Sequence, residues 1–96
     1  MLTGKQRSYL RSIGNSIDPI FQIGKNGINT NFIKQVDDAL EAREIIKVNV
    51  LNNSQLDAKE AANEVAELTK SEFVQSIGNK FILYRESKDN KSIELP

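Results

Sequence analysis

Residues 19–40 have the sequence PIFQIGKNGINTNFIKQVDDAL, in which the signals of two elements and of the loop between them follow one another directly. Its first five residues form a short run that is rich in branched and aromatic side chains. Pro19 and Gly24 mark its two ends, and such a run is typical of a strand. Asn29 or Thr30 can then cap a helix, whose apolar residues recur at helical spacing: Ile33, Val36 and Leu40. The stretch predicts a strand and a helix joined by a tight loop at residues 24–27.

The sequence on either side predicts two more helices and three more strands. Thr3 and Gln6 form a Thr-x-x-Gln capping box at the start of a helix over residues 4–13. Residues 44–51 alternate apolar with polar side chains, as a half-buried strand does, and their polar face is a candidate surface. The alanine-rich residues 58–68 predict a third helix that packs closely on a sheet. Two final strands, residues 73–77 and 80–85, flank the hairpin turn Gly78-Asn79.

The element order α-β-α-β-α-β-β predicts an α/β fold, a two-layer sandwich built on a mixed four-stranded sheet. Helical crossovers join the first three strands, so these should be parallel, whereas the last strand returns antiparallel to the third. Residues 1–88 are expected to form one domain, followed by a polar tail at residues 89–96. The chain from Glu86 onward is expected to be frayed, because it is polar and poorly patterned.

Composition narrows the classes of function. The chain lacks cysteine and histidine, so disulfides, thiolate chemistry, the commonest general base and the usual zinc ligands are missing. We therefore expect no enzyme, no metal site and no cofactor. No apolar run approaches the length that spans a bilayer, and the first residues do not resemble a signal peptide, which favours a cytoplasmic protein.

Charge is unevenly distributed along a chain whose formal net charge is zero. Residues 1–35 contain five basic residues and one acidic residue, a net charge of +4, whereas residues 36–96 contain eight basic and twelve acidic residues, a net charge of −4. Such asymmetry can mean an acidic solvated helix beside an ordinary basic one, or a basic surface for nucleic acid. Composition alone leaves both interpretations open.

The loop Gly24-Lys25-Asn26-Gly27 (the GKNG loop) is the sharpest candidate site. It precedes a helix, where unpaired amides and the helix dipole favour an anion such as phosphate. The glycines allow close backbone approach, and Lys25 adds a positive charge. The loop has neither the G-x-G-x-x-G nor the Walker A spacing, so a nucleotide cofactor is disfavoured. A plain strand-to-helix turn is the alternative.

Further basic residues could extend an RNA surface, although each could also be an ordinary solvated residue. They lie on the first two helices and on the strands: Lys5, Arg7, Arg11, Lys34, Lys47, Lys80 and Arg85. Glu60, Glu64 and Glu67 share one face of the third helix, which a solvated acidic surface explains without catalysis.

Several ordered motifs together resemble the YhbY-like CRM domain family. They are Lys5-Gln6-Arg7 with Leu10-Arg11, Pro19 with Gln22 to Gly27, Ala39-Leu40, Ile45 to Val48, Val74-Gln75-x-Ile77-Gly78-x-Lys80, and Leu83-Tyr84-Arg85. The resemblance implies a fold similar to the C-terminal domain of translation initiation factor three. It also implies a bacterial RNA-binding protein that acts on precursors of the large ribosomal subunit, with ribosomal RNA as its partner.

Four positions depart from the family pattern. Relatives commonly carry histidine near Asn15 and basic residues near Asp18, Asn49 and Asn79, which implies weaker or more localised RNA binding here. We expect a monomer that docks on RNA through the GKNG loop. A protein-protein adaptor that uses the acidic third helix is the first alternative, and an enzyme of RNA metabolism is the second.

Overall fold

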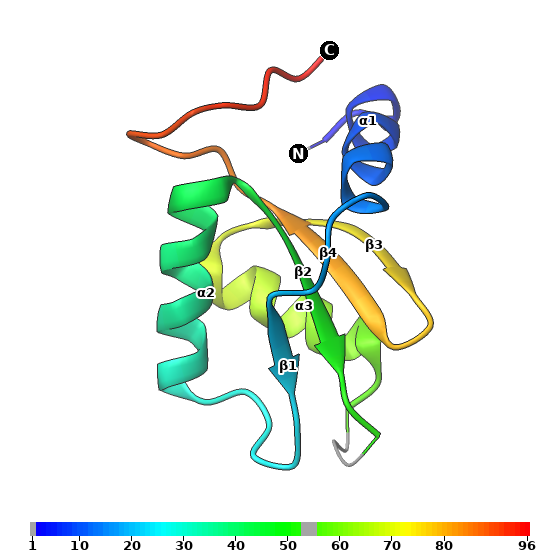
Figure 1. The fold of residues 1–96 in the computed structure, drawn as a ribbon, viewed down its shortest axis with the longest axis vertical. Helices are drawn as coiled ribbons and strands as arrows, with labels where there is room; N and C mark the ends of the chain where they lie inside the picture. Colours follow the sequence, from blue (N-terminus) through cyan, green and yellow to red (C-terminus); the bar gives the residue numbers. More distant parts are fainter. Residues whose placement is uncertain (1, 53–55) are drawn as a thin grey trace.

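The computed structural model describes residues 2–52 and 56–96, and its elements follow the predicted order (Figure 1). The helices are α1 (Gly4–Gly14), α2 (Thr30–Arg43) and α3 (Ala58–Thr69). The strands are β1 (Phe21–Ile23), β2 (Ile45–Val50), β3 (Glu72–Ile77) and β4 (Lys80–Tyr84). The predicted capping box at Thr3 and Gln6 and the cap at Asn29 are both confirmed.

The four strands form one mixed sheet in the order β1-β2-β4-β3. β1 and β2 are parallel, and β4 is antiparallel to both β2 and β3, so the predicted mixed sheet and terminal hairpin are confirmed. β3 runs in the same direction as β2 but does not touch it, because the hairpin places β4 between them. The C-terminal ends of β1, β2 and β3 therefore share one end of the sheet with the start of β4.

The main core lies between the sheet and the two helices α2 and α3. Val36 and Leu40 on α2 and the small residues of α3 are fully or almost fully buried there. Alanines at the contact let the α3 backbone approach the strands closely, as the sequence predicted. The sheet contributes its alternate, inward-facing residues to this core: Ile23, Ile46, Val48, Val50, Phe81 and Leu83.

The first helix, α1, packs against the opposite face of the sheet. Leu10 is fully buried there in a second, smaller cluster with Ile45, Val74, Ile82 and Tyr84. A Cβ added at Gly14 would overlap the Ile82 side chain, so a larger residue at the end of α1 would force Ile82 to shift. In addition to the two predicted layers, α1 thus forms a partial third layer. The order of the elements did not predict on which face of the sheet α1 packs.

The expectation of a frayed chain after Glu86 is wrong. The carboxylate of Glu44 is fully buried and accepts hydrogen bonds from the backbone N–H groups of Ser87, Ser92 and Ile93, each at 2.7 Å. Ile93 and Leu95 pack on the α1 side of the sheet. The prediction failed because it considered only the polarity of the tail. It did not consider the Glu44 carboxylate, directly before β2, which accepts hydrogen bonds from the tail.

Candidate nucleic-acid interface

The GKNG loop connects β1 to α2 at the lower end of the molecule in Figure 1. The N–H of Gly27 donates to the carbonyl oxygen of Gly24 at 3.0 Å, which closes a tight turn. Gly27 has a φ of 65°, in the left-handed region that residues with a side chain rarely adopt. A Cβ added there would meet no atom within 4 Å, so backbone conformation, and not lack of space, requires glycine. The two residues between the glycines, Lys25 and Asn26, are exposed.

The start of α2 is fixed directly beside the loop. The side chain of Asn29 accepts a hydrogen bond from the Phe32 N–H at 2.8 Å and so satisfies one of the amides of the first turn. The Phe32 ring packs edge-on against Phe21 of β1, with ring centroids 5.9 Å apart, which ties the helix start to the sheet. The first turn contains no acidic residue, so the positive end of the helix dipole is not neutralised there.

A shallow groove runs over the loop and the first turns of α2. Lys25 is its charged member, and its side chain and that of Asn26 are exposed. The other polar lining residues are amides, which can donate to phosphate or ribose oxygens and accept from ribose hydroxyls: Gln22, Asn29, Asn31 and Gln35. This combination of one cation, backbone amides and neutral donors suits a phosphate backbone.

Two of the other predicted RNA contacts, Arg7 and Lys47, bond to the backbone inside the fold. Arg7 Nη1 donates to the carbonyl oxygen of Phe73 at 2.8 Å and so ties α1 to β3. Lys47 Nζ donates to the carbonyl oxygens of Gly14 and Ile17, at 3.1 and 3.3 Å, where α1 ends. A cation at this position also complements the negative end of the helix dipole. Both side chains are half-buried and hold α1 on the sheet.

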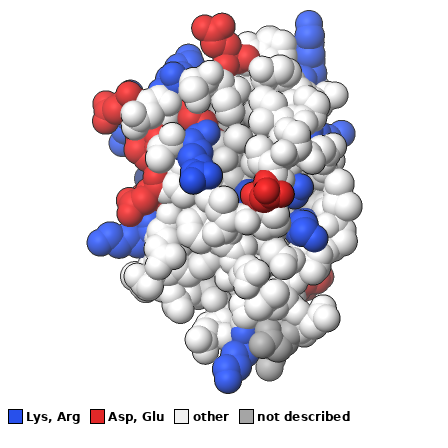
Figure 2. All heavy atoms as spheres, in the orientation of Figure 1, with Lys and Arg blue, Asp and Glu red and all other residues white. Residues whose placement is uncertain are grey.

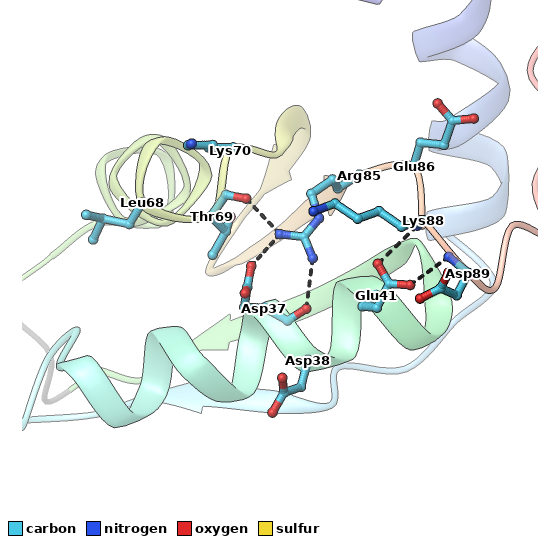
Figure 3. A pocket seen from close by; sticks show the side chains of 10 residues that line it. All are labelled: Asp37, Asp38, Glu41, Leu68, Thr69, Lys70, Arg85, Glu86, Lys88 and Asp89. Carbon is cyan, nitrogen blue, oxygen red and sulfur yellow. Dashed lines mark hydrogen bonds and ion pairs between the residues drawn. The ribbon is translucent and has the colours of Figure 1, made fainter.

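Arg85 lies at the other end of the sheet, where Figure 3 shows its guanidinium between α2 and α3. It donates to the carbonyl oxygen of Thr69 at 2.8 Å and to that of Asp37 at 3.0 Å, and it forms an ion pair with the Asp37 carboxylate. Arg85, the residue that follows β4, therefore links the middle of α2 to the end of α3. This bonding is structural, and it lies away from the GKNG loop.

The remaining predicted cations keep their side chains accessible. Lys5, Arg11 and Lys34 are exposed, and Lys80 is half-buried beside the hairpin turn, with Nζ 3.4 Å from the side-chain oxygen of Asn79. Within the described residues, Lys25 forms neither an ion pair nor a side-chain hydrogen bond. The structure thus separates basic residues that bond internally from basic residues that remain available.

Acidic side chains gather at the far end from the loop, toward the upper left of the face shown in Figure 2. Glu41 accepts hydrogen bonds there from the Ser87 hydroxyl and from the N–H groups of Lys88 and Asp89, which lower its pKa from 4.5 to about 2. Over residues 2–52 and 56–96, no three acidic side chains are grouped to hold a metal ion. The hydrogen bonds of Glu41 instead hold the start of the C-terminal tail.

None of the helices described is long and apolar enough to cross a bilayer.

Sequence reasoning missed a row of side chains on the open face of the sheet. Gln22, Asn49, Lys80 and Ile77 are paired across the four strands in register, so their side chains point to the same face. The alternation in residues 44–51 marked Asn49 as outward-facing, but nothing local in the sequence shows which residues of the other strands stand beside it. The row begins at the groove beside the loop and ends at the hairpin.

Comparison with known proteins identifies relatives over the whole chain. The family model described as the CRS1 / YhbY (CRM) domain matches residues 2–85. A "Probable RNA-binding protein YqeI" from Bacillus subtilis is 54% identical over the full length of both chains. An "RNA-binding protein" from Haemophilus influenzae is 32% identical over 99% of this chain and 95% of its own length. The solution structure of the hypothetical protein SAV1595 from Staphylococcus aureus covers all of both chains, with a TM-score of 0.83 and 64% identity.

Proposed function

Because the chain belongs to the CRS1 / YhbY (CRM) domain family, as its motifs predicted, we propose that it is an RNA-binding protein of large-subunit ribosome assembly. It docks on ribosomal RNA of the subunit precursor and holds the phosphate backbone with the GKNG loop. The names of its relatives support RNA as the partner. The ribosomal target follows from the family resemblance.

The observation that carries the loop assignment is the position of Lys25. Its exposed side chain lines the groove over the loop and the first turns of α2, and the first turn holds no carboxylate to compete for it. A phosphate placed there would meet a cation, the positive end of a helix dipole and backbone amides together. The positive φ of Gly27 supports this assignment, because it turns the chain sharply and leaves the loop backbone uncovered.

The rest of the RNA surface should come from cations that the fold leaves accessible. Lys34 follows the loop on α2, Lys80 starts β4 at the same end of the sheet, and Lys5 and Arg11 lie on α1. Arg7, Lys47 and Arg85 are bonded internally, so we assign them a supporting role. Each accessible cation that meets a phosphate adds to affinity and to its salt dependence.

The proposed activity is binding alone, by a cytoplasmic monomer that needs no cofactor. Phosphate contacts position a protein on RNA without chemistry, and neither histidine nor cysteine is present to supply a general base or a nucleophile. The absence of these residues separates this proposal from an enzyme of RNA metabolism. Turnover of labelled RNA by the purified protein would contradict it.

Crosslinking in growing bacteria tests the proposal most broadly. The tagged protein and its Lys25→Glu variant are crosslinked, and the attached RNA is sequenced. We expect enrichment of large-subunit ribosomal RNA with the parent and loss of that enrichment with the variant. Enrichment of messenger RNA alone would contradict the assembly role. Recovery of ribosomal proteins without crosslinked RNA would instead favour an adaptor acting through the acidic face of α3.

A further inference from the structure

A small pocket opens on the α1 side of the sheet, between the end of α1 and the β3-β4 hairpin. It has a volume of about 140 Å³ and is lined by Asn15, Lys47, Gln75, Ile77, Lys80 and Ile82. Pockets for drug-sized ligands have volumes of about 300 to 1,000 Å³, so this one suits a much smaller group, such as a single planar ring.

The lining offers apolar contact and hydrogen-bonding groups together. Ile82 is buried and Ile77 is 60% exposed, so the pocket has apolar surface both at its base and open to a ligand. Gln75 Nε2 donates to Asn15 Oδ1 at 3.3 Å, which leaves the Gln75 oxygen and the Asn15 NH₂ group for another partner. An unpaired nucleobase needs this combination, because its faces pack on apolar surfaces and its edges form hydrogen bonds.

The pocket is connected to the GKNG loop by the row of outward-facing residues described above. Gln22 lines the groove beside the loop, and Lys80 and Ile77 line the pocket. Asn49 stands between Gln22 and Lys80 in the strand register. Neighbouring strands are about 4.8 Å apart, so the row spans roughly 14 Å over three strand spacings. A short single strand with a phosphate on the loop can therefore reach the pocket across the open sheet.

Asn49 provides an independent indication that a ligand crosses this face. Its side-chain oxygen is buried and has no hydrogen-bond partner among the described residues. A buried acceptor without a donor is costly to a fold, and such atoms are few in native proteins. If the Asn49 side chain turns toward the open face, an amino or hydroxyl group of a bound strand supplies the missing donor. Lys80, half-buried beside Asn49, places a positive charge on the same path.

We propose that the pocket between Asn15, Gln75 and Ile82 holds one unpaired base of the RNA strand whose phosphate lies on the GKNG loop. This inference rests on the proposed function and adds base discrimination to it. The loop supplies affinity for any strand, because phosphates carry no sequence information. The amides of Asn15 and Gln75 supply preference among bases, because they contact base edges.

Binding of short single-stranded RNAs to the full chain, measured by fluorescence anisotropy, tests the inference. The probes are strands of A, of C and of U, together with a strand of stable abasic nucleotides that keeps the phosphates. Gln75→Ala and Asn15→Ala each remove an amide from the pocket, and Asn63→Ala removes an exposed amide from α3 as the matched control. Lys25→Glu reports on the loop. Circular dichroism melting verifies that each variant folds, and the exposed Asn15 is the substitution that the fold should tolerate best.

We expect the parent to prefer one base over the others by about fivefold or more, since a good base-edge contact is worth that much discrimination. Gln75→Ala and Asn15→Ala should reduce this preference and leave affinity for the abasic strand unchanged, whereas Lys25→Glu should weaken binding to every strand. Equal affinity of the parent for all strands, or undiminished preference in both amide variants, would overturn the base pocket and leave RNA binding intact. Failure of the parent to bind any strand would overturn both proposals.

Discussion

The two ends of the sheet use charged and polar residues in opposite ways. At the end that carries the GKNG loop, Lys25 has no partner among the described residues, and amide side chains line an open groove. At the other end, hydrogen bonds join Arg85, Glu41 and Glu44 to backbone and side-chain groups of the same chain. A charged side chain that the fold already satisfies stabilises the protein, and one that it leaves unsatisfied is available to a partner. Substitutions at the first end should therefore affect binding, and substitutions at the second end should affect stability.

Glu44→Ala should have the largest effect and should affect stability alone. The change removes the buried acceptor of three backbone N–H groups and frees the tail from the sheet. Hydrogen bonds to charged groups contribute about 1.5 to 3 kcal/mol each, but the released N–H groups can meet water, so we expect a total loss of about 2 to 4 kcal/mol. Urea unfolding measures it. The exposed Glu64→Ala on α3 is the control, and an unchanged unfolding midpoint in Glu44→Ala would show that the tail does not depend on this carboxylate.

Lys25→Glu should have the next largest effect and should affect RNA binding alone. It places a negative charge where the proposed phosphate lies, which should cost about 1 to 3 kcal/mol of binding free energy, or roughly a ten- to hundredfold loss of affinity. Filter binding to ribosomal RNA measures the affinity, and thermal melting verifies that stability is unchanged. Lys70→Glu reverses the same charge at the end of α3, in the lining of the pocket drawn in Figure 3, and should change affinity much less. Equal losses in the two variants would mean that net charge, and not the loop, determines binding.

Gly27→Ala tests the loop as a structural element. Gly27 has a φ of 65°, so alanine should lower the free energy of unfolding by about 1 kcal/mol, although space for the added methyl group is available. Chemical denaturation with and without RNA measures the change. The same substitution at Gly4, whose surroundings are also open but whose conformation is helical, should be neutral or stabilising. A neutral Gly27→Ala would contradict the conformation described for the loop.

Lowering the pH should destabilise the end of the sheet that carries Glu41 before it affects the GKNG loop. Of the four predicted effects, this one should be the smallest. Hydrogen bonds depress the pKa of Glu41 in the folded state from 4.5 to about 2, so its contribution is present above pH 4.5 and is lost as the pH falls toward about 2. The pKa of Glu44 is lowered as well: burial acts to raise it, but the N–H groups of Ser87, Ser92 and Ile93 outweigh that effect. Urea midpoints across this pH range should fall less steeply in Glu41→Gln than in the parent. Identical slopes would show that the tail contacts do not depend on the charge of Glu41.

Most of the fold could be predicted from the sequence, because periodicity and turn residues act locally. The capping box at Thr3, the cap at Asn29 and the positive φ of Gly78 all follow from neighbouring residues. The position of α1 and the docking of the tail did not follow. Both depend on contacts between residues about 40 or more positions apart, such as Arg7 with Phe73 and Glu44 with Ser92. No local pattern encodes such pairings.

The candidate site was predictable only in part, for a related reason. The GKNG loop is one continuous segment, so its place before a helix could be inferred from spacing. The roles of Arg7, Lys47 and Arg85 depend on which carbonyl or carboxylate the fold brings near them. The sequence alone does not distinguish a basic residue that bonds inside the fold from one that is available to RNA. The base pocket likewise joins residues from the end of α1 with residues of three strands.

The salt dependence of RNA binding tests the role of the GKNG loop most directly. For single-stranded RNA, each cation that neutralises a phosphate contributes about 0.7 to the slope of log affinity against log salt concentration. Lys25→Gln removes one cation without adding an anion, so its slope should be shallower than that of the parent by about 0.7, while Lys70→Gln should keep the parental slope. Parallel lines for Lys25→Gln and the parent, with equal affinities at low salt, would contradict phosphate binding by the loop and place the RNA surface elsewhere.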